Sequence, residues 1–329
     1  MKSKIFVFLF FTVVCASFRS YPQNMASKKD ETTSLDDAVL LADPFIMLYE
    51  GTYYAYGTTN GNKGFDCFLS KDLKIWEKNK DLILNSQKTL GSNNFWAPEV
   101  FYDKKRKRFF LYYTANYEIW VAESSSPLGP FFNPSGSKQP LMMANSIDAS
   151  PFINNKFKLL FFRQRNPKSS EPFIYYVKLN DDLISIKPNS QTLCFGISQN
   201  WEGENVMEGP YVIKYKNWYI LFYSSNRFQS ENYGIGYAYS KSPFGPWIKS
   251  DQNPLIQHLN FNGTFLQGTG HNCVFKDKKG NFKIAFHAHK TPGIGDPRIL
   301  YIGDLNIKIK NEIPVLSISN IIRPKLIQN

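Results

Sequence analysis

The chain contains one pattern five times, and this repeat limits the fold more than any other feature of the sequence. Each copy starts with a short break and continues into two runs rich in β-branched and aromatic residues, which a polar turn separates. The five breaks are Asp43-Pro44, Trp96-Ala97-Pro98, Asp148-Ala149-Ser150-Pro151, Glu208-Gly209-Pro210 and His271-Asn272. Their spacing of roughly 50 to 60 residues is typical of propellers and solenoids.

A further, weaker run follows the pair in each copy, as in residues 68–76 and 235–240. Each repeat therefore holds about four short strands, which is the content of a propeller blade. We predict an all-β fold, a five-bladed β-propeller with about four antiparallel strands per blade. A stacked β-sandwich is the alternative, but it does not require so regular a repeat. The tail has strand character at residues 313–322, and we expect it to close the ring.

Residues 1–20 have the features of a secretory signal peptide. Lys2 and Lys4 supply the positive start, residues 5–14 form an apolar run, and a small-residue cleavage site follows around Cys15. The apolar run is too short to cross a bilayer, so we predict no membrane span.

Lipoprotein anchoring through Cys15 is an alternative for this segment. It is disfavoured because the residues before Cys15, Val13 and Val14, lack the small side chain that such a site needs. We therefore predict an exported protein, periplasmic or extracellular. In this prediction residues 21–34 form a disordered leader and residues 35–329 form a single propeller domain.

Charge and cysteine content exclude some classes of function. The formal net charge is +12 at pH 7, but the basic residues are scattered through predicted turns. A nucleic-acid interface would gather them in a stripe with a known motif, so we predict no nucleic-acid partner. An acidic polysaccharide partner remains open. Cys67, Cys194 and Cys273 are odd in number and widely spaced, which predicts buried thiols and not a disulfide framework.

The repeat also predicts where function lies. The first strand of each propeller blade lines the central channel, so residues at equivalent repeat positions converge at one end of it. These residues are Asp43, Trp96, Asp148, Glu208 and His271. Taken alone, an aspartate before a proline is as consistent with a turn as with a catalytic group.

Three carboxylates at one channel mouth indicate acid–base chemistry on a glycosidic bond. One carboxyl group protonates the leaving oxygen and a second activates water on the other side of the sugar. The acid must be neutral at the working pH, and a third carboxylate close by raises its pKa by like-charge repulsion. Asp43, Asp148 and Glu208 can divide these three roles.

At this point the motifs resemble a known family, glycoside hydrolase family 43. The resemblance rests on Ala42-Asp43-Pro44, Trp96-Ala97-Pro98-Glu99-Val100, Ile147-Asp148-Ala149-Ser150-Pro151-Phe152, Glu208-Gly209-Pro210, and Gly268-Thr269-Gly270-His271 with Phe286-His287-Ala288-His289. The motifs occur in the same order as in the family and extend over nearly the whole chain after the leader. The resemblance implies a five-bladed propeller of inverting enzymes, in which Asp43 is the general base, Glu208 the general acid, and Asp148 the residue that orients the acid and adjusts its pKa.

The same resemblance implies roles for two more residues. His271 matches a histidine near the propeller axis that in some relatives helps to hold a water molecule or a calcium ion. Arg298 resembles an arginine that contacts sugar hydroxyl groups. We predict that no cofactor is required, and that a structural calcium ion in the central channel, held through water by His271, is the one candidate metal. The residues alone leave His271 open between this role and a structural one.

Two aromatic residues complete the predicted site. Phe95 and Trp96 precede the second break, where an aromatic ring can stack on a sugar face or pack in the core. We include both as candidate substrate-binding residues, together with Arg298 and His271.

The leading hypothesis is an inverting exo-glycosidase of plant-type polysaccharide or its oligosaccharides. It would remove terminal α-L-arabinofuranosyl or β-D-xylosyl units and act as a monomer. An endo-acting arabinanase or xylanase of the same fold is one alternative, because loop lengths decide between a closed pocket and an open cleft. A propeller that binds glycans without cleaving them is the other.

Overall fold

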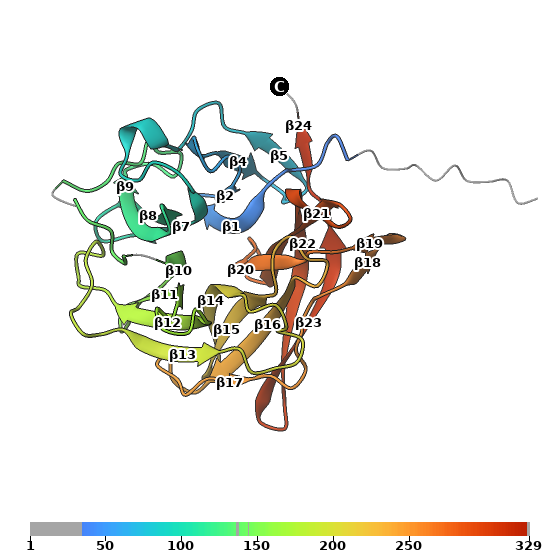
Figure 1. The fold of residues 1–329 in the computed structure, drawn as a ribbon. Coiled ribbons are helices and arrows are strands. Elements are labelled where there is room, and N and C mark those ends of the chain that lie inside the picture. The colour runs from blue at the N-terminus through green and yellow to red at the C-terminus, as the bar shows by residue number, and fades with distance from the viewer. Residues whose placement is uncertain (1–34, 136–137, 144, 328–329) are drawn as a thin grey trace, which may run out of the picture. The chain divides into compact units, whose positions relative to one another are not determined.

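The computed structural model describes residues 35–135, 138–143 and 145–327, which are built almost entirely from β-strands (Figure 1). From residue 35 onward the chain forms one compact unit. The predicted signal peptide (residues 1–20) and leader (residues 21–34) lie outside the described residues. Within the described ranges, no helix has the length and apolarity needed to cross a membrane.

Five antiparallel sheets make up five blades, which we number in chain order. The first contains β1 (Ala42–Tyr49), β2 (Thr52–Thr58), β4 (Cys67–Ser70) and β5 (Ile75–Lys78). The second contains β7 (Trp96–Asp103), β8 (Arg108–Ala115) and β9 (Glu118–Ser124). The third contains β10 (Ser146–Ile153), β11 (Lys158–Arg165), β12 (Pro172–Lys178) and β13 (Thr192–Gly196). The fourth contains β14 (Met207–Tyr215), β15 (Trp218–Ser225), β16 (Gly234–Ser240) and β17 (Ile248–Lys249). The fifth contains β20 (Gly270–Lys276), β21 (Phe282–Thr291), β22 (Ile294–Lys310) and β23 (Ile313–Ile322).

Short elements connect or extend these blades. They are β3 (Gly64–Phe65), β6 (Leu84–Asn85), the 3₁₀ helix η1 (Ser86–Lys88), β18 (Leu259–Phe261), β19 (Thr264–Leu266) and β24 (Lys325–Ile327). The strands β3 and β6 pair with each other, as do β18 and β19.

The first strands of the blades contact one another in a closed cycle. β1 contacts β7, β7 contacts β10, β10 contacts β14, β14 contacts β20, and β20 contacts β1. This cycle confirms the predicted five-bladed propeller, and Figure 1 shows the blades around their common centre. The second blade differs in having three strands. After β9 the chain makes isolated bridges, Ile119 with Met142 and Glu123 with Phe132, in place of a fourth strand.

A β-bulge interrupts the first strand of every blade at the position of the sequence break. One residue at each bulge has a positive φ: Asp43 (47°), Ala97 (44°), Asp148 (60°), Gly209 (59°) and His271 (23°). Bulges turn a strand and redirect its side chains, and a positive φ is unfavourable for residues other than glycine. Because the same bulge occurs in all five blades, we infer that the bulges direct side chains toward the channel end of the propeller.

Side chains of the preceding blade stabilise four of these bulges. Each accepts a hydrogen bond of 3.0 Å from the backbone N–H of the bulge residue. The pairs are Asp43 with His287 Nδ1, Ala97 with Thr58 Oγ1, Asp148 with Thr114 Oγ1, and Gly209 with Asp148 Oδ2. These contacts satisfy N–H groups that the bulge removes from the sheet, and they fix each blade to its neighbour.

The core lies between the blades. Every residue of β15 is buried, because neighbouring blades cover both faces of the sheet. Cys67 and Cys273 are buried free thiols, as predicted. Cys194 is also free but only half-buried, because it lies on β13 at the outer edge of the third blade.

The two ends of the described chain close the ring. β24 pairs in parallel with β5 of the first blade, with Leu326 opposite Trp76. Asp37 forms ion pairs of 3.1 Å with both Arg323 and Lys325. The prediction that the tail closes the ring is confirmed, but the closing strand is β24. Residues 313–322 instead form β23, the outer strand of the fifth blade.

Deletion of residues 325–329 is expected to lower the melting temperature by roughly 5 °C, since it removes the ladder between β24 and β5 and one ion pair of Asp37. Differential scanning calorimetry measures the shift. Lys310→Ala, at an exposed hairpin end, is the control and should melt like the wild type. An unchanged melting temperature in the deletion variant would show that β24 does not contribute to ring closure.

Candidate active site

A cavity of about 570 Å³ lies where the bulged ends of the first strands meet. All five blades contribute to its lining. The predicted site residues that line it are Asp43, Trp96, Asp148, Glu208, His271 and Arg298. The structure therefore brings together six of the seven residues that the sequence predicted for the site, from positions far apart in the chain.

Phe95 is the exception, and its prediction as a substrate-binding residue is wrong. Its side chain is fully buried in the core and stacks on Tyr113, with ring centroids 5.9 Å apart. Trp96 points the other way, lines the cavity and meets Tyr117 edge-on at 5.1 Å. Successive side chains of an extended segment point to opposite sides, so only one of the two neighbours can face the channel.

Asp43 is held as a carboxylate. Its Oδ1 accepts a hydrogen bond from Arg298 Nη1 at 3.1 Å, and its Oδ2 accepts one from the Thr58 hydroxyl at 2.6 Å. Burial alone would raise the pKa of Asp43, but the charge of Arg298, together with smaller contributions from His271, His287 and the Thr58 hydroxyl, outweighs burial and lowers this pKa below the usual range. Asp43 is therefore ionised at any pH near neutral, as a general base requires.

Arg298 is fixed from three sides. It pairs with Asp43, its Nε donates to Asp296 at 3.0 Å, and its guanidinium lies 4.5 Å from the centroid of the Phe228 ring. The side chain is 8% exposed and its remaining surface faces the cavity. The sequence predicted a contact with sugar hydroxyl groups; the pairing with Asp43 was not foreseen.

Asp148 and Glu208 have the opposite electrostatic character. Burial, and then the charge of Asp43, raise the pKa of Asp148 to about 7. Burial, and then the charge of Asp148, raise the pKa of Glu208 to about 7. The site therefore holds one ionised carboxylate beside two carboxyl groups whose pKa values are raised to about 7, which is the division that acid–base catalysis needs.

Hydrogen bonds orient these two carboxyl groups. Asp148 Oδ2 accepts from the backbone N–H of Gly209, the residue directly after Glu208, at 3.0 Å. Tyr233 donates its hydroxyl to Glu208 Oε1 at 2.9 Å. Gly209 has φ 59°, and a Cβ at this position would lie 3.1 Å from the His271 ring. The glycine therefore allows His271, Asp148 and the Glu208 strand to approach closely.

His271 lies between the carboxylates. Its Nδ1 is 3.5 Å from Asp43 Oδ1 and 3.9 Å from Asp148 Oδ2. Burial lowers the pKa of His271, so the ring is neutral at neutral pH.

Direct coordination of calcium does not fit this donor set, and the predicted ion, held through water by His271, stays a prediction. Calcium takes six to eight oxygen ligands. In the part of the chain that the structure describes, no three His, Cys, Asp or Glu side chains are grouped as metal ligands. His271 offers one nitrogen, and the carboxylate of Asp43 is already bound by Arg298 and Thr58.

Sequence reasoning missed three residues of the site, Thr58, Tyr233 and Phe228, and assigned no contact to a fourth, His287, which it placed in the family motif. Thr58 and His287 hold the side chain and the backbone of Asp43, Tyr233 binds Glu208, and Phe228 lines the cavity beneath Arg298. The neutral ring of His287 stacks on the ring of Tyr233, with centroids 5.7 Å apart. The residue that holds the Asp43 backbone therefore contacts the residue that binds Glu208. Thr58 and Tyr233 make their hydrogen bonds to the two carboxyl groups within their own blades, whereas His287 and Phe228 reach residues of a neighbouring blade, and the spacing of the sequence did not indicate which atoms would meet.

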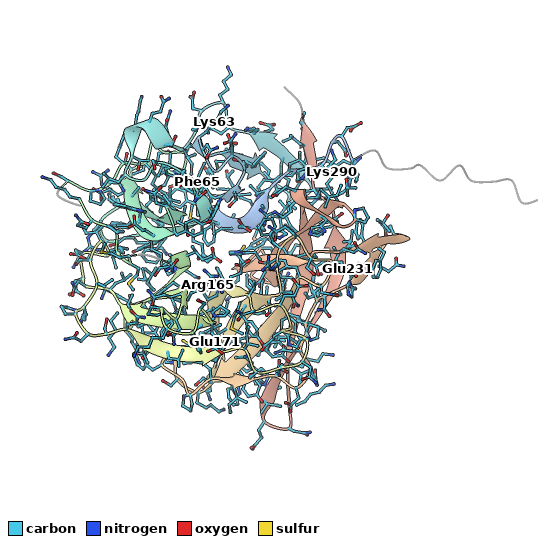
Figure 2. The ribbon with its side chains drawn as sticks, in the orientation of Figure 1. Lys63, Phe65, Arg165, Glu171, Glu231 and Lys290 are labelled. Carbon is cyan, nitrogen blue, oxygen red and sulfur yellow. The ribbon has the colours of Figure 1, made fainter. Side chains whose placement is uncertain are left out.

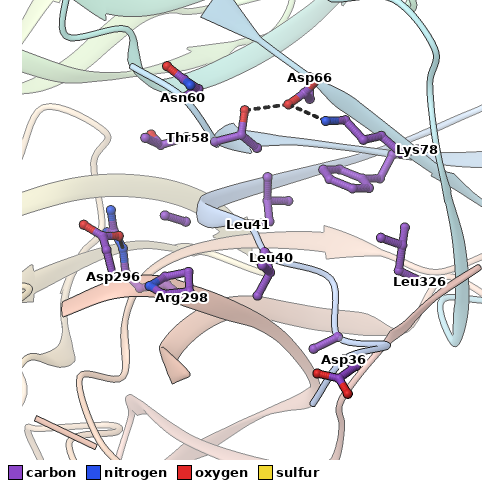
Figure 3. Close-up of a pocket in the computed structure, with 15 residues that line it drawn as sticks. Asp36, Leu40, Leu41, Thr58, Asn60, Asp66, Lys78, Asp296, Arg298 and Leu326 are labelled. Atoms are coloured by element: carbon purple, nitrogen blue, oxygen red, sulfur yellow. Dashed lines mark hydrogen bonds and ion pairs between the residues drawn. The ribbon is translucent and has the colours of Figure 1, made fainter. Parts of the chain in front are cut away.

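A second cavity, of about 490 Å³, adjoins the first. The two share Thr58, Thr59, Asp296, Pro297 and Arg298 in their linings. The second cavity runs between the first and fifth blades, over Leu40 and Leu41, and the ion pair of Lys78 with Asp66 (3.0 Å) borders it (Figure 3). Space therefore continues outward on the side of the site where Asp43 lies.

Comparison with known proteins gives consistent matches. A family model described as "Glycosyl hydrolases family 43" matches residues 38–305. A solved structure described as an endo-1,4-β-xylanase from Bacteroides thetaiotaomicron is 38% identical, with a TM-score of 0.81 over 89% of this chain and 99% of that one. The β-D-galactofuranosidase xynD of Aspergillus niger is 28% identical over 82% of this chain and 81% of its own. An extracellular exo-α-(1→5)-L-arabinofuranosidase of Streptomyces avermitilis is 28% identical over 78% of this chain and 56% of its own.

Proposed function

The chain belongs to glycosyl hydrolase family 43, and from this premise we propose that it is an inverting exo-glycosidase with Asp43 as base and Glu208 as acid. One observation carries the proposal. A single cavity holds a carboxylate whose pKa is lowered and two carboxyl groups whose pKa is raised to about 7. An inverting glycosidase needs this combination of an ionised base and a protonated acid.

The proposed reaction occurs in a single displacement. Asp43 accepts a proton from a water molecule as the water oxygen bonds to the anomeric carbon. The bond from that carbon to the leaving oxygen breaks, and Glu208 gives its proton to this oxygen. Asp148 holds the strand of Glu208 through Gly209 and keeps the pKa of the acid raised. Exchange of protons with solvent then restores Asp43 to its ionised form and Glu208 to its protonated form.

The proposed substrates are polysaccharides or oligosaccharides with terminal α-L-arabinofuranosyl or β-D-xylosyl units. Relatives named an arabinofuranosidase, a galactofuranosidase and a xylanase support sugars of this kind but differ among themselves. Trp96 and Phe228 offer aromatic surface for a sugar ring, and Arg298 offers N–H donors for hydroxyl groups. Export is also a proposal, supported by relatives that are named extracellular.

Endo action is the second candidate, and the second cavity favours it. That cavity adjoins the Asp43 side of the site, where further sugar units attached to the reacting unit would extend. The size of the first products separates the candidates. An exo enzyme releases monosaccharide from the start of a digest, whereas an endo enzyme first releases oligosaccharides.

Activity is expected to fall as the pH rises through about 7. The acid must carry its proton, and the pKa values of Asp148 and Glu208 are raised to about 7, so the active form is present below this pH and is lost above it. On the acid side activity persists well below neutral pH, because the pKa of Asp43 is lowered. A profile of kcat/KM against pH measures both limbs, and a flat profile through pH 7 would contradict the assignment.

Proton NMR of the anomeric signal during digestion of a branched arabinoxylan tests the proposed function. Release of arabinose or xylose of inverted configuration is the expected result. Retained configuration would exclude the single displacement. Binding of oligosaccharides without any product, tested across arabinoxylan, arabinan and galactan, would support the non-catalytic alternative.

A further inference from the structure

Arg163 is a buried guanidinium without a protein partner. It lies on β11 and is 6% exposed, and it forms no hydrogen bond or ion pair with any residue in the described ranges. Buried charged groups are normally paired, because five unsatisfied N–H donors are costly to remove from water. Within the described residues no acceptor lies within hydrogen-bond distance of Arg163, so its guanidinium is open to an acceptor from outside the protein.

This side chain is on the same face of the third blade as Ile147, a residue that lines the active-site cavity. Arg163 lies opposite Ile147 in the register of β10 and β11, and Ile147 lines the cavity. Directly opposed residues on paired strands point to the same face of a sheet. In agreement, the charge of Arg163 opposes the rise in the pKa of both Asp148 and Glu208.

Two further arginines gather at the same place. Arg165 lies two residues along β11, on the same face, and donates to the Ser170 carbonyl oxygen at 2.6 Å. Arg227 follows β15 and directly precedes Phe228 in the cavity lining. Burial, and then the charges of Arg163 and Arg227, lower the pKa of Arg165. Figure 2 labels Arg165 near the middle of the propeller face. We call these three residues the arginine cluster.

The charges of Asp148 and Glu208 act on the arginine cluster from beyond ion-pair distance. None of its members has an ion pair within the described part of the chain, whereas Arg298 pairs with both Asp43 and Asp296. Glu204 lies close by, but its oxygens accept the Ser230 hydroxyl and the backbone N–H of Arg227. An anion from outside the protein would meet several unpaired N–H donors here.

We propose that the arginine cluster binds the carboxylate of a uronic acid unit in the part of the substrate that leaves. This inference rests on the proposed function. Glu208 protonates the leaving oxygen, so the first sugar of the departing chain lies beside Glu208. Arg165 Nη2 donates to the carbonyl oxygen of Asn205, three residues before Glu208, at 3.5 Å. Arg163 is opposite Ile147, the residue before Asp148, which in turn binds the backbone of Gly209. The planar fork of a guanidinium matches the two oxygens of a carboxylate. The natural substrate is therefore a neutral terminal sugar attached to an acidic chain.

A matched pair of substrates tests this proposal. The 4-carboxyphenyl α-L-arabinofuranoside and its methyl ester differ in one negative charge on the leaving group. At low salt the wild type should prefer the carboxylate in kcat/KM by about tenfold. Arg165→Gln and Arg227→Gln should each reduce this ratio to about one to threefold. Arg108→Gln, an exposed arginine at the opposite end of the second blade, is the control and should keep the wild-type ratio.

Salt and direct binding supply independent readouts. Raising the salt to about 1 M shortens the screening length to about 3 Å and should remove most of the preference, which a purely structural role of the arginines would not predict. Calorimetric titration should show D-glucuronate binding more tightly than D-glucose, and more tightly than D-glucose 6-sulfate if the anion is a carboxylate. Arg163→Gln should abolish this difference, and Arg163→Lys should restore part of it.

The outcomes separate this inference from the proposed function. Hydrolysis of both substrates without a carboxylate preference overturns the inference and leaves the glycosidase assignment intact. If the enzyme hydrolyses neither substrate, the assignment as a glycosidase for this sugar is contradicted. The calorimetric titration then tests by itself whether the arginine cluster binds a carboxylate. Equal binding of D-glucuronate and D-glucose would overturn the proposal that the arginine cluster binds an acidic sugar. Tighter binding of D-glucose 6-sulfate than of D-glucuronate would show that the preferred anion is not a carboxylate.

Discussion

Asp43→Asn is expected to reduce kcat by roughly 10⁴-fold, the largest loss of any single substitution in the site. The amide has nearly the same shape but cannot accept the proton of the attacking water. The loss should be similar for substrates with good and poor leaving groups, because water must be activated for both. Steady-state kinetics on an aryl arabinofuranoside and on an oligosaccharide measures it.

Asp296→Asn is the matched control for this substitution. It makes the same chemical change on the other carboxylate that binds Arg298, and the Asp296 side chain is 63% exposed. We expect a loss of less than about tenfold, as for an exposed ion pair. A loss of less than tenfold for Asp43→Asn, in a variant that melts like the wild type, would remove Asp43 from the role of base.

Glu208→Gln should give the second largest effect, and one that depends on the leaving group. On an oligosaccharide, whose leaving oxygen needs a proton, kcat should fall by roughly 10³-fold. On a 4-nitrophenyl glycoside, whose leaving group departs without protonation, the loss should be about tenfold. The part of the basic limb that comes from loss of the Glu208 proton should also disappear, because this carboxyl group, whose pKa is raised to about 7, is gone.

Glu204→Gln is the control for the acid, since Glu204 is on the loop that leads into the same strand and binds Ser230 instead of facing Glu208. It should retain both the activity and the pH profile within a few fold. Equal losses on the two substrates in Glu208→Gln would mean that this residue binds or orients the sugar and does not supply the proton.

The repeat in the sequence predicted the blades and the three carboxylates for one physical reason. Equivalent positions in a repeat occupy equivalent positions on the first strands, so Asp43, Asp148 and Glu208 had to converge once five blades formed a ring. What it could not predict were contacts between blades. His287 binds the backbone of Asp43 across 244 residues of sequence, and no local pattern encodes that distance.

Two differences from prediction have local causes. Phe95 was placed in the site with its neighbour Trp96, but side-chain alternation directs it into the core. The closing strand was placed at residues 313–322 because this run has the stronger strand composition. The three residues of β24 are too few to be recognised, and their parallel pairing with β5 depends on where the ring brings the two edges together.

The bulge at Asp43 has a consequence for the order in which the protein becomes functional during synthesis. The ribosome makes Asp43 first among the site residues, yet His287 and Arg298, which hold its backbone and its carboxylate, follow 244 and 255 residues later. A nascent chain with four complete blades therefore carries Asp43 without the groups that hold its backbone and its carboxylate. The backbone and the carboxylate of Asp43 are held as described here only when the fifth blade joins the first.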